Sequence, residues 1–211
     1  MNPPTPTEAP AQRRQRADGR RSRDTILDNA ARLATVEGLD GLSIGRLAER
    51  TGMSKSGLYA HFTSKEALQL ATIERAEEIF EDEVLSPARR KADGLRRLWA
   101  LSDEFLSHLE REVFPGGCFF AAVGAEFDTQ PGRVKERIGV FIEAWMGELM
   151  AAAATAQQAG ELPADLDLEQ LIYEVDALLL MAHATYTMYG EPALLERARV
   201  GLARLLGPRP E

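Results

Sequence analysis

One short stretch of this 211-residue chain, residues 43–68, strongly constrains how the chain can fold. Ser43, Ser54 and Ser64 each stand where a helix would begin, with a side-chain oxygen able to accept a free N–H of the first turn. Gly52 stands where the first of these helices would end, because glycine readily adopts the left-handed conformation that follows a last helical turn. The stretch therefore predicts three short helices with a tight turn between the first two.

The first two predicted helices, Ile44–Arg50 and Lys55–His61, form a helix-turn-helix, a unit whose second helix enters the DNA major groove. Leu58 and Phe62 lie four residues apart, so we expect them to hold the second helix against the core. Taken singly, each polar residue here has an ordinary structural interpretation as a cap or a solvated side chain. The ordered set favours DNA contact, because its members donate to bases or phosphates or allow close approach. The candidates are Ser43, Arg46, Thr51, Lys55, Ser56, Gly57, Tyr59, His61 and Lys65.

This pattern resembles the N-terminal DNA-binding domain of the TetR family of bacterial regulators over about residues 20–70. The residues that carry the resemblance are Leu42-Ser43-Ile44, Leu47-Ala48, the run from Thr51 to Phe62, and Ser64-Lys65-Glu66-Ala67-Leu68, preceded by a helix over Arg23–Glu37. The resemblance implies an all-helical homodimer that binds a palindromic double-stranded DNA operator. It also implies that a small-molecule effector, which the sequence does not identify, usually releases the DNA.

The distribution of charge agrees with a nucleic-acid site at the N-terminal end. The net charge is −8, yet residues 1–62 carry ten Lys and Arg against seven Asp and Glu. A basic patch beside the reading element is what DNA binding requires. Arg20, Arg21 and Arg23 precede the first predicted helix, so we expect them to reach phosphates or the minor groove as an arm. A solvated basic tail is the alternative explanation for these arginines.

Beyond residue 64 the apolar residues recur at helical spacing, and we find no strand alternation, so we predict an all-α fold of about nine helices. The expected organisation is a disordered, Pro-rich and basic arm over residues 1–19, a DNA-binding domain over residues 20–66, and a ligand-binding and dimerisation domain over residues 67–211. The last two helices are apolar on more than one side. The resemblance implies that they form the homodimer interface, although a thick monomer core would give the same pattern.

An effector would need a cavity among the middle helices, lined by aromatic side chains with a few polar tips. Filling the core is the ordinary role for each such residue, and Trp145 and Tyr173 are the strongest candidates because each brings a polar tip to an apolar stripe. We expect a largely apolar effector, and we expect Cys118 to be an inert buried thiol rather than a sensor. The candidate lining residues are Trp99, Phe105, Cys118, Phe119, Phe120, Phe141, Trp145, Met146, Tyr173 and Met181.

Other classes of protein find less support in the sequence. A single cysteine excludes an intrachain disulfide, and the absence of a long uncharged apolar run or a secretory signal predicts a cytoplasmic protein with no membrane span. No spacing of His and Cys suggests a metal site, and no catalytic or phosphate-binding motif occurs, so we expect neither cofactor nor enzymatic activity.

We therefore expect a regulator of transcription, and we favour a repressor. Two alternatives remain open. One is a dimeric DNA-binding protein without an effector, and the less favoured one is an enzyme or small-molecule binder with a vestigial helix-turn-helix.

Overall fold

The computed structural model describes the backbone of residues 10–210 and the side chains of residue 19 and residues 21–210. All regular structure in this part of the chain is helical, as predicted. A π-helical turn, Glu81–Leu85, joins α4 to α5, so the ten α segments make nine continuous rods. The helices are α1 Pro10–Glu37, α2 Ile44–Thr51, α3 Lys55–Tyr59, α4 Lys65–Phe80, α5 Ser86–Arg89, α6 Leu95–Glu110, α7 Phe119–Phe127, α8 Arg133–Gln158, α9 Leu168–Tyr189 and α10 Pro192–Leu206.

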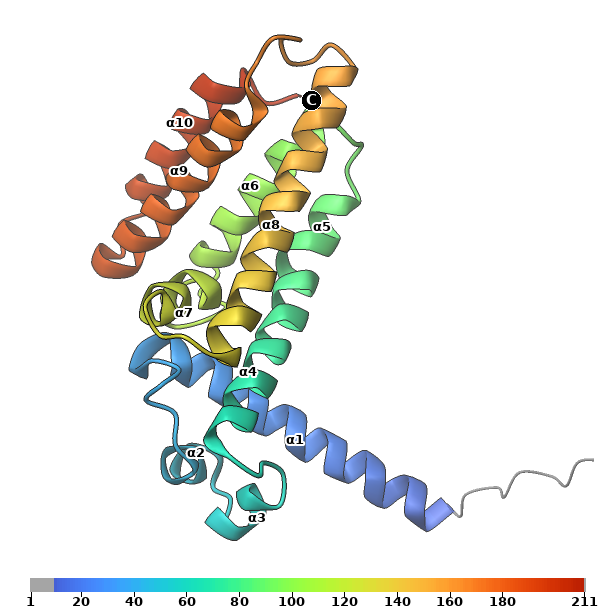
Figure 1. Cartoon of the computed structure of the whole chain (residues 1–211), viewed down its shortest axis with the longest axis vertical. Coiled ribbons are helices and arrows are strands. Elements are labelled where there is room, and N and C mark those ends of the chain that lie inside the picture. The colour runs from blue at the N-terminus through green and yellow to red at the C-terminus, as the bar shows by residue number, and fades with distance from the viewer. Residues whose placement is uncertain (1–9, 211) are drawn as a thin grey trace, which may run out of the picture.

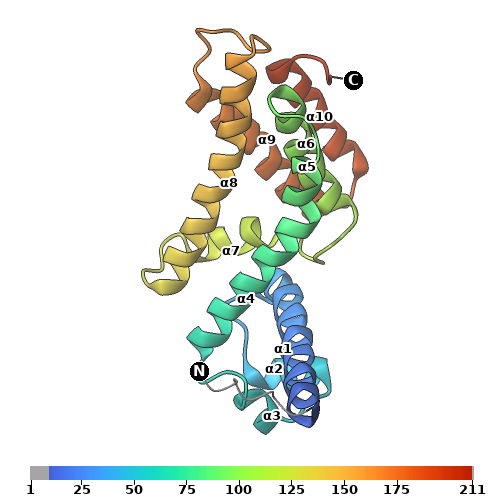
Figure 2. The ribbon, with the colours of Figure 1, turned by 90° about the vertical axis from the view of Figure 1, so that its right-hand side faces the viewer.

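The helices form a small lower unit and a larger upper bundle in the view of Figure 1. Helices α1, α2, α3 and the first turns of α4 make the lower unit, which places α3 at one end of the molecule. Helix α4 continues upward and packs along α8, while α6, α8 and α9 pack against one another. The view from the side in Figure 2 shows α7 lying across the bundle just above the lower unit. Helix α7 is therefore the element of the upper bundle that meets α1.

Helix α1 begins earlier than the sequence predicted. We expected a helix from Arg23 after a disordered arm, whereas α1 starts at Pro10. Proline suits a first helical turn because its missing N–H would have no partner there, and the alanine, arginine and glutamine residues that follow are good helix formers. The part of the predicted arm over residues 1–9 lies outside the described residues.

The upper bundle is organised around one aromatic side chain. Phe80, at the end of α4, is 2% exposed and meets five other aromatic rings edge-on. Such edge-to-face contacts add to the free energy of ordinary apolar burial. The rings around it come from α6, α7 and α8: Phe105, His108, Phe120, Phe141 and Trp145.

Helix α8 is long and apolar enough, by length and composition alone, to cross a membrane. The core helix of a globular bundle passes the same test, because it too presents an apolar stripe along many turns. Here α8 packs against α4, α6, α7 and α9. Its buried positions include Ile138, Phe141, Trp145 and Leu149, which recur at the three- and four-residue spacing of a core stripe.

Candidate functional site

The three predicted serine caps are present at the lower end of the molecule. Ser43, Ser54 and Ser64 accept hydrogen bonds from Arg46 N at 3.3 Å, Gly57 N at 3.1 Å and Ala67 N at 3.0 Å. Gly52 ends α2 with φ of 67°, in the left-handed region where L side chains are disfavoured. These caps fix where α2, α3 and α4 begin, and they build the helix-turn-helix that the sequence indicated.

Helix α3 is anchored as predicted, but it is shorter. Leu58 is fully buried and Phe62 is 3% exposed, so both hold the helix against the unit. The helix ends at Tyr59 rather than His61, because His61 N bonds to Leu58 O in a tighter turn. Around the buried anchors the side chains of Lys55, Ser56 and Tyr59 are exposed, and Gly57 and His61 are half-buried. An open polar surface therefore lies at the end of the molecule, next to the helix that would enter a groove.

Besides Ser43, which caps α2, and Ser56, whose hydroxyl lies 3.2 Å from Ser54 Oγ, three more of the predicted DNA contacts are engaged within the protein. The Arg46 guanidinium donates to both carboxylate oxygens of Glu37, at 2.6 and 3.0 Å. Lys65 Nζ lies 2.6 Å from Asp40 Oδ1. Thr51 donates its hydroxyl proton to Leu47 O at 2.7 Å, so that proton is directed away from DNA. The sequence did not reveal these pairs, because each partner of a cation lies nine or more residues away.

The arginines of α1 are only partly described. Arg21 and Arg23 are exposed, and the Arg23 guanidinium lies 5.6 Å from the centre of the Phe62 ring, within the range of a cation–π contact. Arg20 lies in the α1 backbone, but its side chain is outside the described residues. Arg50, which the sequence analysis did not select, is exposed in the last turn of α2 on the same unit.

The upper bundle contains a narrow apolar cavity of about 80 Å³. It lies between α4, α6, α7, α8 and α9, and five of the ten predicted lining residues meet there: Phe105, Cys118, Phe120, Phe141 and Trp145. The cavity also includes residues that the sequence analysis missed: Phe80, Ala121, Ile142, Asp176 and Leu180. The signal for Asp176 was present in the sequence, since an acidic residue interrupts an apolar helix there.

The other predicted lining residues lie elsewhere. Phe119 is buried between Phe114 and Phe120, and Met146 is half-buried beside the core. Tyr173 and Met181 do not line the aromatic cavity, because they are 69% and 61% exposed on the outer face of α9, where Tyr173 borders a separate hollow of about 390 Å³ beside α10. Helical periodicity shows which residues share a face, but it does not decide which apolar face turns inward.

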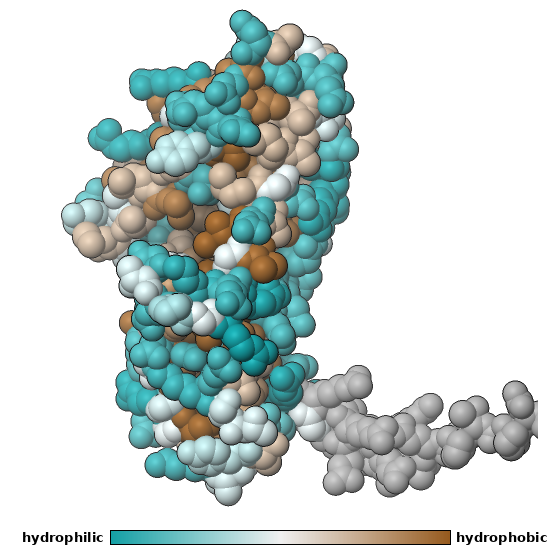
Figure 3. Space-filling model, viewed as in Figure 1, coloured by the Kyte–Doolittle hydropathy of each residue, from teal (hydrophilic) through white to brown (hydrophobic). Residues whose placement is uncertain are grey.

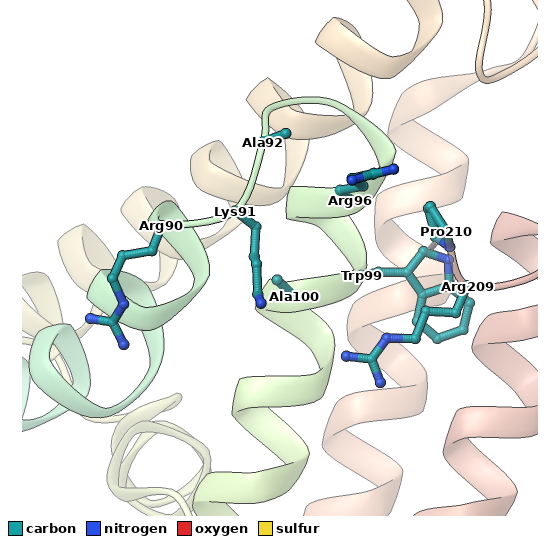
Figure 4. Close-up of a pocket in the computed structure, with 8 residues that line it drawn as sticks. All are labelled: Arg90, Lys91, Ala92, Arg96, Trp99, Ala100, Arg209 and Pro210. Carbon is teal, nitrogen blue, oxygen red and sulfur yellow. The ribbon is translucent and has the colours of Figure 1, made fainter.

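Trp99 lines a different and larger cavity, of about 590 Å³, near the start of α6. Figure 4 shows Arg209 and Pro210 beside its indole ring, with Arg90 and Lys91 on the segment before α6 and Arg96 in its first turn. The walls are strongly cationic, and all four of the basic residues, Arg90, Lys91, Arg96 and Arg209, are exposed. This cavity lies at the end of the bundle away from α3. Trp99 is therefore not part of the aromatic cavity.

The two ionisable groups of the aromatic cavity are Cys118, which is buried, and Asp176, which is half-buried. Asp176 Oδ1 accepts a hydrogen bond from Trp145 Nε1 at 2.9 Å. Burial raises the pKa of Asp176, and the indole N–H opposes that rise. Burial also raises the pKa of Cys118 to about 11, so the thiol is protonated at neutral pH, which agrees with the expected inert thiol.

Helix α7 forms part of the wall of the aromatic cavity and also makes hydrogen bonds to the lower unit. Glu126, near its C-terminal end, accepts hydrogen bonds from Leu39 N at 2.7 Å and Asp40 N at 2.8 Å in the loop between α1 and α2. Gly38 makes room for this carboxylate: a β-carbon there would lie 2.9 Å from Glu126 Oε1, and its φ of 83° disfavours other residues. The same helix thus places Phe120 in the cavity and Glu126 against the loop before the helix-turn-helix. We call the two hydrogen bonds of Glu126 to this loop the α7 clamp.

A second connection runs from α9 to α1 through the loop before α7. Gly116 N donates to Thr35 Oγ1 at 3.1 Å, and Gly116 O lies 3.3 Å from His183 Nε2. Adding a β-carbon at Gly116 would place it 1.9 Å from Thr35 O, so the loop is packed directly on α1. The lower unit is therefore attached to the upper bundle at two points close to α7, namely the hydrogen bonds of Glu126 and those of Gly116.

The fold and the helix-turn-helix define a helical transcription regulator, and comparison with known proteins gives the family. Residues 26–72 match the model described as "Bacterial regulatory proteins, tetR family". Residues 94–202 match "Tetracyclin repressor-like, C-terminal domain". The chain belongs to the TetR family of transcriptional regulators.

Individual relatives share this architecture. A TetR transcriptional regulator from Chloroflexus aurantiacus J-10-FL is 27% identical, with a TM-score of 0.82 over 89% of this chain and 95% of that one. AibR, solved in complex with isovaleryl coenzyme A and operator DNA, is 24% identical, with a TM-score of 0.71 over 87% and 97%. The transcriptional activator FasR of Mycolicibacterium smegmatis is 30% identical over 90 residues, which span 43% of this chain and only 41% of FasR.

Proposed function

We propose that this regulator binds a palindromic operator as a homodimer and is released from it by a small, largely apolar effector. The observation that carries the proposal is one helix, α7, that both lines an apolar cavity and holds the loop in front of the helix-turn-helix. A ligand that moved α7 would move the loop between α1 and α2. We place the protein in the cytoplasm, where it meets chromosomal DNA.

The proposed DNA-binding residues are the candidates from the sequence analysis. We rank them by whether their side chains are exposed or already paired within the protein. Lys55 and Ser56 at the start of α3 are exposed and suit base or phosphate contacts. Tyr59 is 64% exposed and suits a phosphate, while Gly57 permits close approach of the backbone. Arg46 and Lys65 would reach DNA only by leaving Glu37 and Asp40. The arm arginines, Ser43 and His61 would add phosphate contacts at the edges.

The homodimer proposal is supported by the outer face of α9. Tyr173, Leu180, Met181 and Met188 are between 46% and 73% exposed, an apolar strip on a helix whose opposite face is already buried. Val200 on the adjoining α10 is also exposed. Figure 3 shows apolar surface on the upper part of this side of the molecule, where α9 and α10 lie in Figure 1. A strip of this kind is characteristic of a protein–protein contact.

The dimer is tested by placing a charge in the strip. We expect Met181→Asp to give a monomer in sedimentation analysis, because an interface of this kind would bury the carboxylate without a partner. Glu174→Asp, a conservative change on the same helix, serves as the control and should remain dimeric. A dimeric Met181→Asp protein would show that the interface lies elsewhere.

Effector control is proposed as a shift of population. The effector must bind the form that fits DNA poorly more tightly than the form that fits well, or it changes nothing. AibR, which shares the fold, was solved with an acyl-CoA and operator DNA together, which supports both binding functions on one chain of this shape. We favour repression for this chain. FasR, a relative of this chain, is a transcriptional activator, so activation is the opposite outcome that a reporter assay must distinguish.

A dimer without an effector is the second candidate, favoured by the small size of the cavity. At about 80 Å³ it is well below the roughly 300–1,000 Å³ of typical ligand sites. A larger effector would therefore have to displace the cavity walls, which include the rings of Phe120 and Phe141, stacked on each other with centroids 3.3 Å apart. Thermal stabilisation of the protein by members of an apolar compound library would favour the effector-controlled form.

The decisive experiment is selection from a random duplex DNA library, followed by titration at two salt concentrations. We expect an enriched inverted repeat whose affinity falls steeply with salt, because phosphate contacts release counterions. Selection of no sequence by ligand-free protein would contradict the proposal. A reporter gene placed behind the selected operator then distinguishes repression from activation.

A further inference from the structure

The aromatic cavity contains a single carboxyl group and no basic one. Among its ten lining residues Asp176 is the only acid, and neither lysine nor arginine is present. One of its oxygens, Oδ1, accepts the Trp145 indole N–H at 2.9 Å. The side chain therefore sits at the wall of an otherwise apolar space, where a charged carboxylate would have no cationic partner among the described residues.

Five of the other nine lining residues are aromatic, and the remaining four are Cys118, Ala121, Ile142 and Leu180. The rings of Phe105 and Trp145 stack with centroids 6.0 Å apart, and Phe80 lies edge-on to both. Phe120 and Phe141 form a second, nearly parallel pair with centroids 3.3 Å apart, so their facing sides are covered and they line the cavity with their outer faces and edges. The face of an aromatic ring attracts a cation through its quadrupole, and it does so most strongly where water is excluded. An aromatic box with one carboxylate is thus complementary to an apolar cation.

We propose that the effector of this regulator carries a compact, apolar cation, such as a methylated ammonium group, which enters the aromatic box and pairs with Asp176. This inference rests on the proposed role of the cavity as the effector site. Carboxylate or phosphate groups of a ligand would be repelled from the box by Asp176, so any such group would have to remain outside it.

Size, access and charge agree with this ligand class. A space of about 80 Å³ suits one small group rather than a whole drug-sized molecule. Ile142 on α8 lines the cavity and is 41% exposed, so the route inward passes this residue rather than Leu180, which the proposed dimer interface would cover. Residues 63–211 carry fifteen Lys and Arg against twenty-six Asp and Glu, and this negative field attracts cations.

The test compares two ligands of the same shape. Choline has a trimethylammonium head, and 3,3-dimethylbutan-1-ol carries an uncharged tert-butyl group in its place. The chain has two tryptophans, so a Trp99→Phe variant leaves Trp145 as the only indole, at the cavity wall. We expect its fluorescence to report a preference of about tenfold or more for choline. Calorimetric titration of the unmodified chain repeats the comparison without any substitution.

Asp176→Asn is the variant that isolates the charge. It keeps the size of the side chain and an oxygen that accepts the Trp145 N–H. We expect the preference for choline to disappear while the affinity for the alcohol is retained. Equal binding of the two ligands by the unmodified chain, an unchanged preference in the variant, or no binding of choline at about 10 mM would each overturn the inference.

The outcome for the ligand class is separate from the outcome for DNA release. Binding is measured here in the absence of DNA. A clear preference for choline with no change in operator affinity would leave the cation site standing and would contradict effector-controlled release. If a neutral apolar ligand released the operator and its effect did not depend on Asp176, effector-controlled regulation would stand. The proposal that the effector is a cation would then be contradicted.

Discussion

The lower DNA-binding unit and the upper bundle are stabilised in different ways. In the lower unit, short helices are defined by hydroxyl caps at Ser43, Ser54 and Ser64 and by a few buried side chains such as Leu58. In the upper bundle, rings from three helices, α6, α7 and α8, converge on Phe80 of α4. The difference shows that the lower unit depends on local contacts, whereas the cavity exists only because distant segments meet. The two parts are joined by α4, which runs through both, and by the contacts of α7 with α1 and the loop after it.

The largest effect is expected from removing the centre of the aromatic cluster. Phe80→Ala should lower the free energy of unfolding by about 3–5 kcal/mol, since it leaves a large void among five rings. Chemical denaturation followed by tryptophan fluorescence measures the loss. Phe62→Ala in the lower unit is the matched comparison, and we expect a smaller effect because Phe62 meets fewer rings. Equal losses would contradict the larger contribution that we assign to the ring contacts of Phe80.

Acid should weaken the upper bundle through His108. This residue is 1% exposed, and burial lowers its pKa from 6.5 to about 4. The unfolded chain therefore binds more protons than the folded chain between these values, so the stabilising free energy is complete above pH 6.5 and is lost as the pH falls towards 4. The loss from this residue is about 3 kcal/mol.

The contribution of His108 is measured by comparing pH profiles. His108→Phe keeps a ring against Phe80 and Phe114 but cannot titrate. We expect the stability of this variant to fall less between pH 7 and pH 4 than that of the unmodified protein, by about 3 kcal/mol. Parallel profiles for the two proteins would assign the acid sensitivity to other groups.

Substitutions on the exposed face of the lower unit should change DNA binding and leave folding intact. Lys55→Ala is expected to relax the preference at one operator position, at a cost of about 1–3 kcal/mol for the preferred base. Tyr59→Phe and Lys65→Ala should instead weaken binding to all sequences alike. Lys91→Ala, at the far end of the bundle, is the control. A selection with Lys55→Ala that returned the unchanged motif would contradict a base contact by this residue.

The smallest effect on stability, and the most informative for coupling, is expected at the α7 clamp. Glu126→Gln keeps the shape but weakens the hydrogen bonds to Leu39 N and Asp40 N, with an expected loss of about 1 kcal/mol. The effector-induced change in operator affinity should shrink in this variant. Glu161→Gln is a matched control, because Glu161 also accepts a backbone N–H, from Leu95, but far from the lower unit. An unchanged response in Glu126→Gln would place the coupling elsewhere, for example at Gly116 and Thr35.

The sequence alone determined the helical class, the position of the helix-turn-helix and its family. These features could be predicted because a serine cap, a glycine end and an anchor four residues later act within one or two turns of the chain. The cavity was only half predictable. Aromatic residues such as Phe120 and Trp145 were recognised, yet Tyr173 and Met181 share their chemistry and face outward.

Only the tertiary structure decided which apolar face turned inward, which cations were already paired and which helix joined the two parts. The Arg46–Glu37 and Lys65–Asp40 pairs and the clamp from Glu126 to the loop at Leu39 connect residues separated by 9, 25 and 87 positions. Asp176 meets Trp145 across 31 positions in the same way. Contacts of this kind depend on how whole helices pack, and a pattern with the period of a single helix carries no information about its neighbours.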